Sequence, residues 1–209
     1  MSSSHATDRR RGDPSRGEGT TDVAATTAAT GVAPTLRRLY SLRFGFALVW
    51  AVLLFLGASS ISPLTAVLLV LYPLFDVAAA VVDTRSSRAT GSATGHAAGL
   101  YINITISAIA AVGLAVALTS GIPAVLRVWG VWAVVAGVVQ LVVAIRRRQL
   151  GGQWAMIASG SISVLAGVSF VLMASNAGAS LANVAGYALL GGVFFLVSAL
   201  RLGRTAGRD

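Results

Sequence analysis

The chain has 209 residues, of which 56% are hydrophobic and only 11% are charged. A soluble domain has about 25% charged residues, so this composition excludes an ordinary water-soluble domain and indicates burial in a lipid bilayer. The formal net charge is +9 and every basic residue is an arginine, but most of the arginines flank apolar runs, so we expect no nucleic-acid partner. Cysteine is absent, which excludes disulfides and thiolate chemistry.

Neither end of the chain has the apolar periodicity of a folded segment. Residues 1–36 are rich in Ser, Thr, Gly, Ala and charged residues, so we predict a disordered cytoplasmic tail. No apolar run follows its basic residues at signal-peptide distance, so we do not interpret it as a cleaved signal. Residues 37–201 are the predicted transmembrane domain, and residues 202–209 are a second cytoplasmic tail.

Apolar runs recur through the predicted transmembrane domain. Each is close to the ~20 residues that an α-helix needs to cross a hydrocarbon core ~30 Å thick. Pro63 suits the first turn of the second run, where its missing N–H would be unpaired anyway. Pro73 interrupts that run and is expected to kink it, and a polar loop is expected over residues 84–95. We predict an all-α bundle of six spans, at residues 43–58, 64–82, 97–118, in the two arms of 127–173, and at 181–200.

The connections alternate between uncharged turns and arginine-rich segments. The turns near residues 59–62, 119–123 and 175–180 carry no charge. The other flanks carry Arg37, Arg38 and Arg43; Arg85 and Arg88; Arg146, Arg147 and Arg148; and Arg201, Arg204 and Arg208. Because arginines favour the cytoplasmic side, we predict that both termini are cytoplasmic in a plasma (inner) membrane. Only Arg127 falls on the outer side, where we predict a contact with lipid headgroups.

Small residues form a stripe on each arm of 127–173. The first stripe has i, i+3, i+7, i+10, i+14 spacing, and its members are Gly130, Ala133, Gly137, Gln140 and Ala144. The second consists of Ser159, Gly160, Ser163, Ala166 and Gly167. Helices in lipid associate through close contacts of small residues, so we predict that these glycines pack helices. The stripes are also compatible with a homo-oligomer.

An internal repeat relates the fourth and sixth spans. AVVAGVVQLVVAIR (133–146) aligns with ALLGGVFFLVSALR (188–201), which makes Gly192 the counterpart of Gly137 and a further predicted packing residue. A similar shift aligns Ser107 and Gly113 with Ser161 and Gly167. We therefore predict that the bundle is built from about three repeated helical hairpins, with an ambiguous register in the first.

RVWGVWAVVAGVVQLVVAIRRR followed by GGQWAMIASGSISVLAGVSFVL resembles the short-repeat module of the HdeD family, in which a Gly-containing span ends in a basic turn. The resemblance is clearest over 120–200 and weaker over 61–118. It implies a six-span bacterial inner-membrane protein with a role in acid or envelope stress. It assigns no functional residues.

Asp76, Asn103 and Gln140 form the candidate polar cluster. Counted from the cytoplasmic ends of the second, third and fourth spans, each lies ~8 to 10 Å deep at helical rise. An acid at this depth should turn inward and pair, and two amides are suitable partners. One interpretation is a structural hydrogen-bonded cluster. The other is a proton-linked or transport role, which would make the protein a small transporter or proton-coupled permease.

The sequence lacks the side chains that the enzyme classes considered for a membrane protein need. The only histidines are His5, in the tail, and His96, in a loop, so neither can act as the base for an intramembrane serine. Asp76 and Asp83 share a helix face, but FDVAAAVVD lacks the further charged residues of a phosphotransfer site. We therefore predict a non-enzymatic protein with no cofactor and no metal. Its expected partner is the lipid bilayer, and no soluble substrate is identifiable.

Overall fold

The computed structural model describes residues 37–89, 93–146 and 154–205, and within these ranges the secondary structure is entirely helical. Six of the helices are long and apolar enough to cross a membrane. The first covers Arg37–Leu56, and the others are α2 (Pro63–Ala89), α3 (Ala93–Ala117), α4 (Ile122–Arg146), α5 (Trp154–Met173) and α6 (Ala182–Thr205). This confirms the predicted all-α class and its six membrane-length helices. The short 3-10 helix η1 (Leu118–Ser120) joins α3 to α4.

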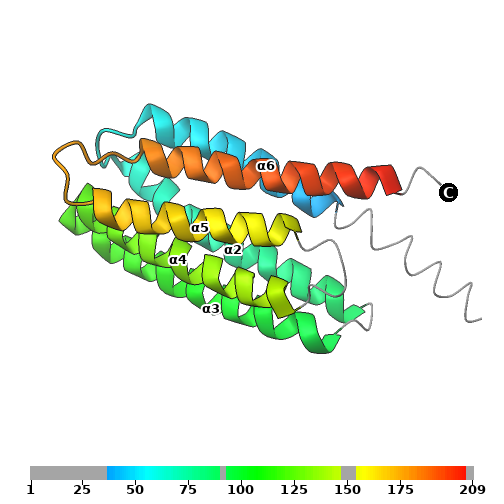
Figure 1. The fold of residues 1–209 in the computed structure, drawn as a ribbon. Helices are drawn as coiled ribbons and strands as arrows, with labels where there is room; N and C mark the ends of the chain where they lie inside the picture. The colour runs from blue at the N-terminus through cyan, green and yellow to red at the C-terminus, as the bar shows by residue number, and fades with distance from the viewer. Residues whose placement is uncertain (1–36, 90–92, 147–153, 206–209) are drawn as a thin grey trace, which may run out of the picture.

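The helices lie side by side, and the chain passes up and down between two ends of the bundle (Figure 1). The first helix begins and α6 ends at the same end of the bundle. We call this the arginine end, because its described helix termini carry the exposed residues Arg37, Arg38, Arg85, Arg146 and Arg201. The turns at 57–62, 118–121 and 174–181 lie at the other end, which we call the turn end.

Some predicted helix boundaries are wrong. The first helix begins at Arg37, six residues before the expected start, and α2 continues to Ala89 through much of the expected loop at 84–95. The next helix, α3, begins at Ala93, so His96 is helical and not in a loop. Polar residues continue a helix once it has left the apolar layer, and Thr84 bonds the carbonyl of Ala80 at 2.7 Å. The helix α2 continues across Pro73, so the proline does not end the second span, and the expected kink stays a prediction.

The tails and two connections are only partly covered. Residues 1–36 lie outside the described ranges, as do Arg147, Arg148 and Arg208. The side chains of Asp83, Arg88, His96 and Arg204 are likewise not described. At the other boundary, α6 runs to Thr205 and so extends into the expected C-terminal tail.

Large apolar side chains cover the outside of the helices. Leu56, Val112, Leu165 and Leu172 expose between 67% and 79% of their surface. Such a surface would be unfavourable in water over a whole bundle, whereas hydrocarbon solvates it. The pattern agrees with a membrane location for the helices.

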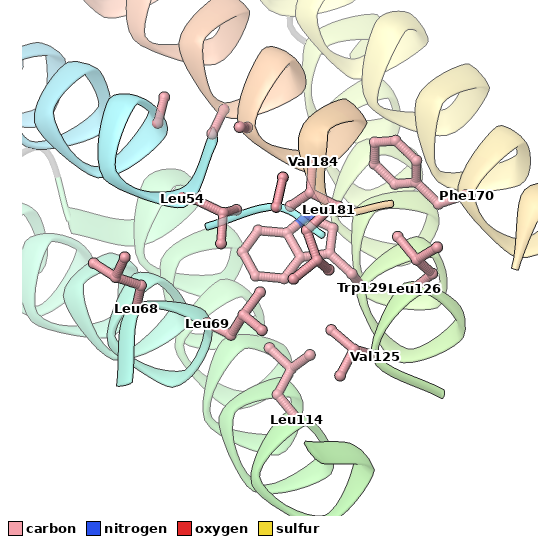
Figure 2. Packing of buried hydrophobic residues seen from close by; sticks show 14 of the residues in the cluster. Leu54, Leu68, Leu69, Leu114, Val125, Leu126, Trp129, Phe170, Leu181 and Val184 are labelled. Carbon is pink, nitrogen blue, oxygen red and sulfur yellow. The ribbon is translucent and has the colours of Figure 1, made fainter. Parts of the chain in front are cut away.

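The apolar core lies toward the turn end and receives side chains from all six helices. Trp129 of α4, which is fully buried, lies at its centre, and leucines, valines and a phenylalanine surround it in Figure 2. The labelled neighbours are Leu54, Leu68, Leu69, Leu114, Val125, Leu126, Phe170, Leu181 and Val184. Dense packing of this kind fixes the positions of all six helices at this end.

Hydrogen bonds hold the turns together at the same end. The Leu181 amide donates to the Ala58 carbonyl at 3.1 Å, which joins the turn before α6 to the turn after the first helix. The Ser62 hydroxyl accepts from the Thr65 amide at 3.1 Å and caps α2, which begins at Pro63 as predicted. These contacts satisfy backbone groups that helix ends would otherwise leave unpaired.

The glycines of α4 and α5 allow the two backbones to touch. A methyl group added at Gly130 would lie 2.5 Å from the Gly167 carbonyl oxygen, and one at Gly137 would lie 2.7 Å from the Gly160 carbonyl oxygen. No side chain fits at those distances, so these four glycines pack helices. Gly192 of α6 approaches the first helix instead, where an added methyl would lie 3.0 Å from the Ala47 methyl.

We predict that Gly167→Ala lowers the stability of the purified protein. Relief of a clash with the backbone requires α4 and α5 to move apart, at a cost of about 1 to 3 kcal/mol of unfolding free energy. The measurement is thermal and chemical unfolding in detergent, followed by tryptophan fluorescence. The matched control is Gly186→Ala in α6, where an added methyl meets nothing within 4 Å. Equal stability of the two variants would contradict the proposed contact.

Candidate functional site

Asp76 of α2 is the centre of a polar cluster in the arginine half of the bundle. Its Oδ2 atom accepts two hydrogen bonds from α3, from Asn103 Nδ2 at 2.7 Å and from Ser107 Oγ at 2.9 Å. Its Oδ1 atom lies 3.5 Å from Nη2 of Arg43 in the first helix. The carboxylate is thus held between three helices, and its side chain is 23% exposed.

The hydrogen bonds continue from Asp76 into α4. Ser107 is fully buried, and its hydroxyl, which donates to Asp76, also accepts from Trp132 Nε1 at 3.2 Å. Asn103 and Ser107 are four residues apart, so they lie on one face of α3 and reach the same oxygen atom. The result is a continuous polar path from α2 through α3 to α4.

Arg43 has fewer partners than its charge requires. Its side chain is 15% exposed, and its guanidinium carbon lies 4.9 Å from the centre of the Phe195 ring in α6, a cation–π distance. Within the described residues its ion pair is with Asp76, at 3.5 Å, which is long for a charge-assisted hydrogen bond. The Nε atom is buried and has no hydrogen-bond partner. The guanidinium therefore retains hydrogen-bonding capacity.

A partly open cavity of about 520 Å³ adjoins the cluster. All six helices line it. Each helix contributes at least one polar residue to the lining, and in chain order these include Arg43, Asp76, Asn103, Gln140, Ser163 and Ser198. The volume is within the range of roughly 300 to 1,000 Å³ typical of small-molecule sites.

Four aromatic residues lie where the turn-end core meets the cavity, and we call them the aromatic cluster: Trp50, Tyr72, Trp129 and Trp132. Trp50 and Trp129 belong to the core, and Tyr72 and Trp132 pack against it. Trp129 contacts the other three, with ring centroids 5.2 to 5.6 Å away. Tyr72 and Trp132 also line the cavity, so the cluster closes its inner side. Aromatic contacts of this kind contribute about 0.5 to 1.5 kcal/mol each beyond burial.

The predicted polar residues are only partly brought together. Asn103 bonds Asp76, whereas Gln140 lines the same cavity without a hydrogen bond to Asp76 in the described structure. Arg127 is exposed near the turn end, and its Nη2 donates to the Ser175 hydroxyl at 3.0 Å. Its contact with lipid headgroups stays a prediction.

Sequence reasoning missed Arg43, Ser107 and Trp132 as members of the site. Arg43 was assigned to the arginine flank, although it lies six residues inside its helix, or ~9 Å at helical rise. The first span was predicted to begin at Arg43, so nothing in the sequence indicated this depth. Ser107 was within reach of sequence reasoning, because it follows Asn103 by one helical turn.

Comparison of the chain with known protein families, with curated proteins and with solved structures found no match. The resemblance to the HdeD family therefore stays a prediction, and the function of the site has to be inferred from its own geometry.

We predict that Asp76→Leu destabilises the protein by about 1 to 3 kcal/mol, because it leaves the donors of Asn103 and Ser107 without an acceptor inside the bundle. Asp76→Asn keeps one acceptor oxygen and should cost less. Denaturant unfolding in detergent measures both variants. Thr105→Val is the control, since the Thr105 hydroxyl is exposed and bonds only the Tyr101 carbonyl of its own helix. If leucine costs no more than asparagine, the hydrogen bonds to Asp76 do not stabilise the fold.

Proposed function

We propose that this protein is a small, non-enzymatic transporter, a permease of the bacterial plasma membrane that carries its solute through the cavity beside Asp76. The observation that carries the proposal is a cavity lined by all six helices, with an ion pair in its wall and an apolar core beyond it. Ionisable groups inside membrane domains are expensive to bury, and they commonly mark substrate or ion pathways.

We propose that the arginine end is cytoplasmic, as the positive-inside rule implies for Arg37, Arg38, Arg85, Arg146 and Arg201. Both termini are then in the cytoplasm, and the proposal requires that the cavity opens toward that side. The aromatic cluster blocks the way to the outer face in this conformation. Alternation between two states would require that cluster to separate.

Pro73 supplies a place for such a movement. It has no N–H to donate to the Leu69 carbonyl one turn earlier, so α2 is weakened at this point. Its neighbour Tyr72 contacts both Trp129 and Trp132. In the proposed cycle, a bend of α2 at Pro73 draws Tyr72 away from the two tryptophans and opens the cavity outward.

A second candidate is an HdeD-like role in acid or envelope stress, with Asp76 as a sensing group and no transport. The close contacts of Gly130 with Gly167 and of Gly137 with Gly160 favour it, because they fall within the hairpin that carries the resemblance. The repeated hairpins and association into a homo-oligomer belong to this candidate. Access to the cavity from one side or from both distinguishes the two functions.

We predict that a cysteine at Gly191 reacts with a charged, membrane-impermeant thiol reagent from both sides of the membrane. Gly191 lines the cavity, and the cysteine-free chain gives no background. Reaction from the cytoplasmic side should be fast in inside-out vesicles. Reaction from the outer side should be slower in right-side-out vesicles, because it waits for the outward-open state.

Two control positions define the measurement. Ser120→Cys at the turn end should react only from outside, whereas Val112→Cys, 67% exposed on an apolar face of α3, should react from neither side. Reaction of Gly191→Cys only from the cytoplasm, even after long exposure, would contradict transport and support the sensing role. Reaction of Ser120→Cys from the cytoplasm would contradict the proposed orientation.

A further inference from the structure

The hydrogen bonds around Asp76 and Arg43 are unevenly distributed. The two oxygens of Asp76 receive two short hydrogen bonds and one ion pair, so the carboxylate is well supplied. Arg43, with five N–H groups, has one oxygen at 3.5 Å and one ring face, and its buried Nε atom has no partner. Buried donors without acceptors are costly, so this wall of the cavity is suited to a group that brings oxygen acceptors.

The rest of the cavity is suited to an apolar body. The lining from α4, α5 and α6 includes the apolar residues Val139, Val143, Ile162, Leu190 and Phe194, beside a few polar ones such as Gln140 and Ser163. Arg43 and Asp76 are the only charged side chains among the described lining residues. The carboxylate of Asp76 is already paired with Arg43. A cationic ligand would therefore have to compete with that arginine for Asp76, whereas an anionic ligand can add oxygen acceptors to the guanidinium.

The surface of the arginine end, toward which we propose that the cavity opens, favours the approach of an anion. The charged side chains described at the arginine end outside the cavity are the exposed arginines Arg37, Arg38, Arg85, Arg146 and Arg201. Positive charge at the mouth of a low-dielectric cavity raises the local concentration of anions and their rate of association. Arg43 continues this positive charge into the membrane domain.

We propose that the cavity binds an anionic amphiphile, with its carboxylate or phosphate oxygens on Arg43 and its apolar body against the walls formed by α4, α5 and α6. This inference rests on the proposed function, because it names the class of solute for the same cavity. The oxygen acceptors pair with the Nη donors of Arg43, whose side chain lines the cavity and is 15% exposed, and Asp76 keeps the guanidinium oriented. The source of the anion is either a soluble organic acid or a lipid.

The test measures binding to the full-length protein in maltoside micelles by isothermal titration and by quenching of tryptophan fluorescence, since Trp132 lines the cavity. The probes are phenylbutyrate, its matched alcohol and its matched amine, together with a short-chain lysophosphatidate. We expect both anions to bind at least about tenfold more tightly than the alcohol, because a charge-assisted hydrogen bond contributes enough free energy for that difference. The amine should bind no better than the alcohol.

A cavity-filling variant locates the site without disturbing the ion pair. Gly191 lines the cavity, and an added side chain starts in open space there, so Gly191→Leu should weaken binding of the anions about tenfold or more. Gly186→Leu is the matched control on the exposed face of α6, also in open space, and should leave binding unchanged. Arg43→Gln should reduce the affinity for the acid to that for the alcohol, whereas Arg38→Gln should not.

The binding results distinguish the two sources of the anion from each other, and both from a failure of the proposal. Binding of lysophosphatidate alone assigns the anion to the lipid, and binding of phenylbutyrate alone assigns it to the soluble acid. Equal binding of acid, alcohol and amine, binding insensitive to Gly191→Leu, or no anion binding at millimolar concentration would overturn the inference. Tight binding of the amine that Gly191→Leu abolishes would overturn the anion assignment while leaving transport through the cavity intact.

Discussion

The pairing of Asp76 constrains the arginine half of the bundle more than any other contact. A carboxylate inside a membrane domain needs partners within the protein, because lipid supplies none. Arg43 of the first helix and Asn103 and Ser107 of α3 provide them, and Trp132 extends the hydrogen bonds to α4. These helices therefore have a fixed rotation and depth relative to α2.

The two halves of the molecule are built differently, and the cavity is a consequence. Toward the turn end, Trp50, Leu69, Leu114 and Trp129 fill the interior, and each exposes at most 1% of its surface. Toward the arginine end, the facing positions carry small residues such as Gly99, Ala136 and Gly191, which leave space. The glycine contacts draw α5 onto α4, whereas α5 approaches α6 much less closely. The volume beside Asp76 lies within this looser packing.

The number and type of the helices could be predicted from the sequence because composition and run length decide them. The glycine contacts were also accessible, since small residues at helical spacing have few other uses in lipid. The site was harder to predict. Depth along the helix suggested that Gln140 lies beside Asp76. Depth does not specify the rotation of a helix about its axis, however, and Gln140 lines the cavity without a hydrogen bond to Asp76 in the described residues. The positive-inside rule already explained Arg43, so its second role beside Asp76 was overlooked. The end of α2 was placed too early because polar residues outside the apolar layer can still be helical.

The most direct test of the central claim, that Arg43 and Asp76 are coupled inside the bundle, is a double-mutant cycle with Arg43→Met and Asp76→Leu. Each single variant leaves a polar or charged partner unpaired, whereas the double variant removes both charges. If the two residues interact as described, the free energies of unfolding will be non-additive, with a coupling on the order of 1 to 3 kcal/mol. Additive losses would contradict the ion pair and the organisation of the cavity that depends on it.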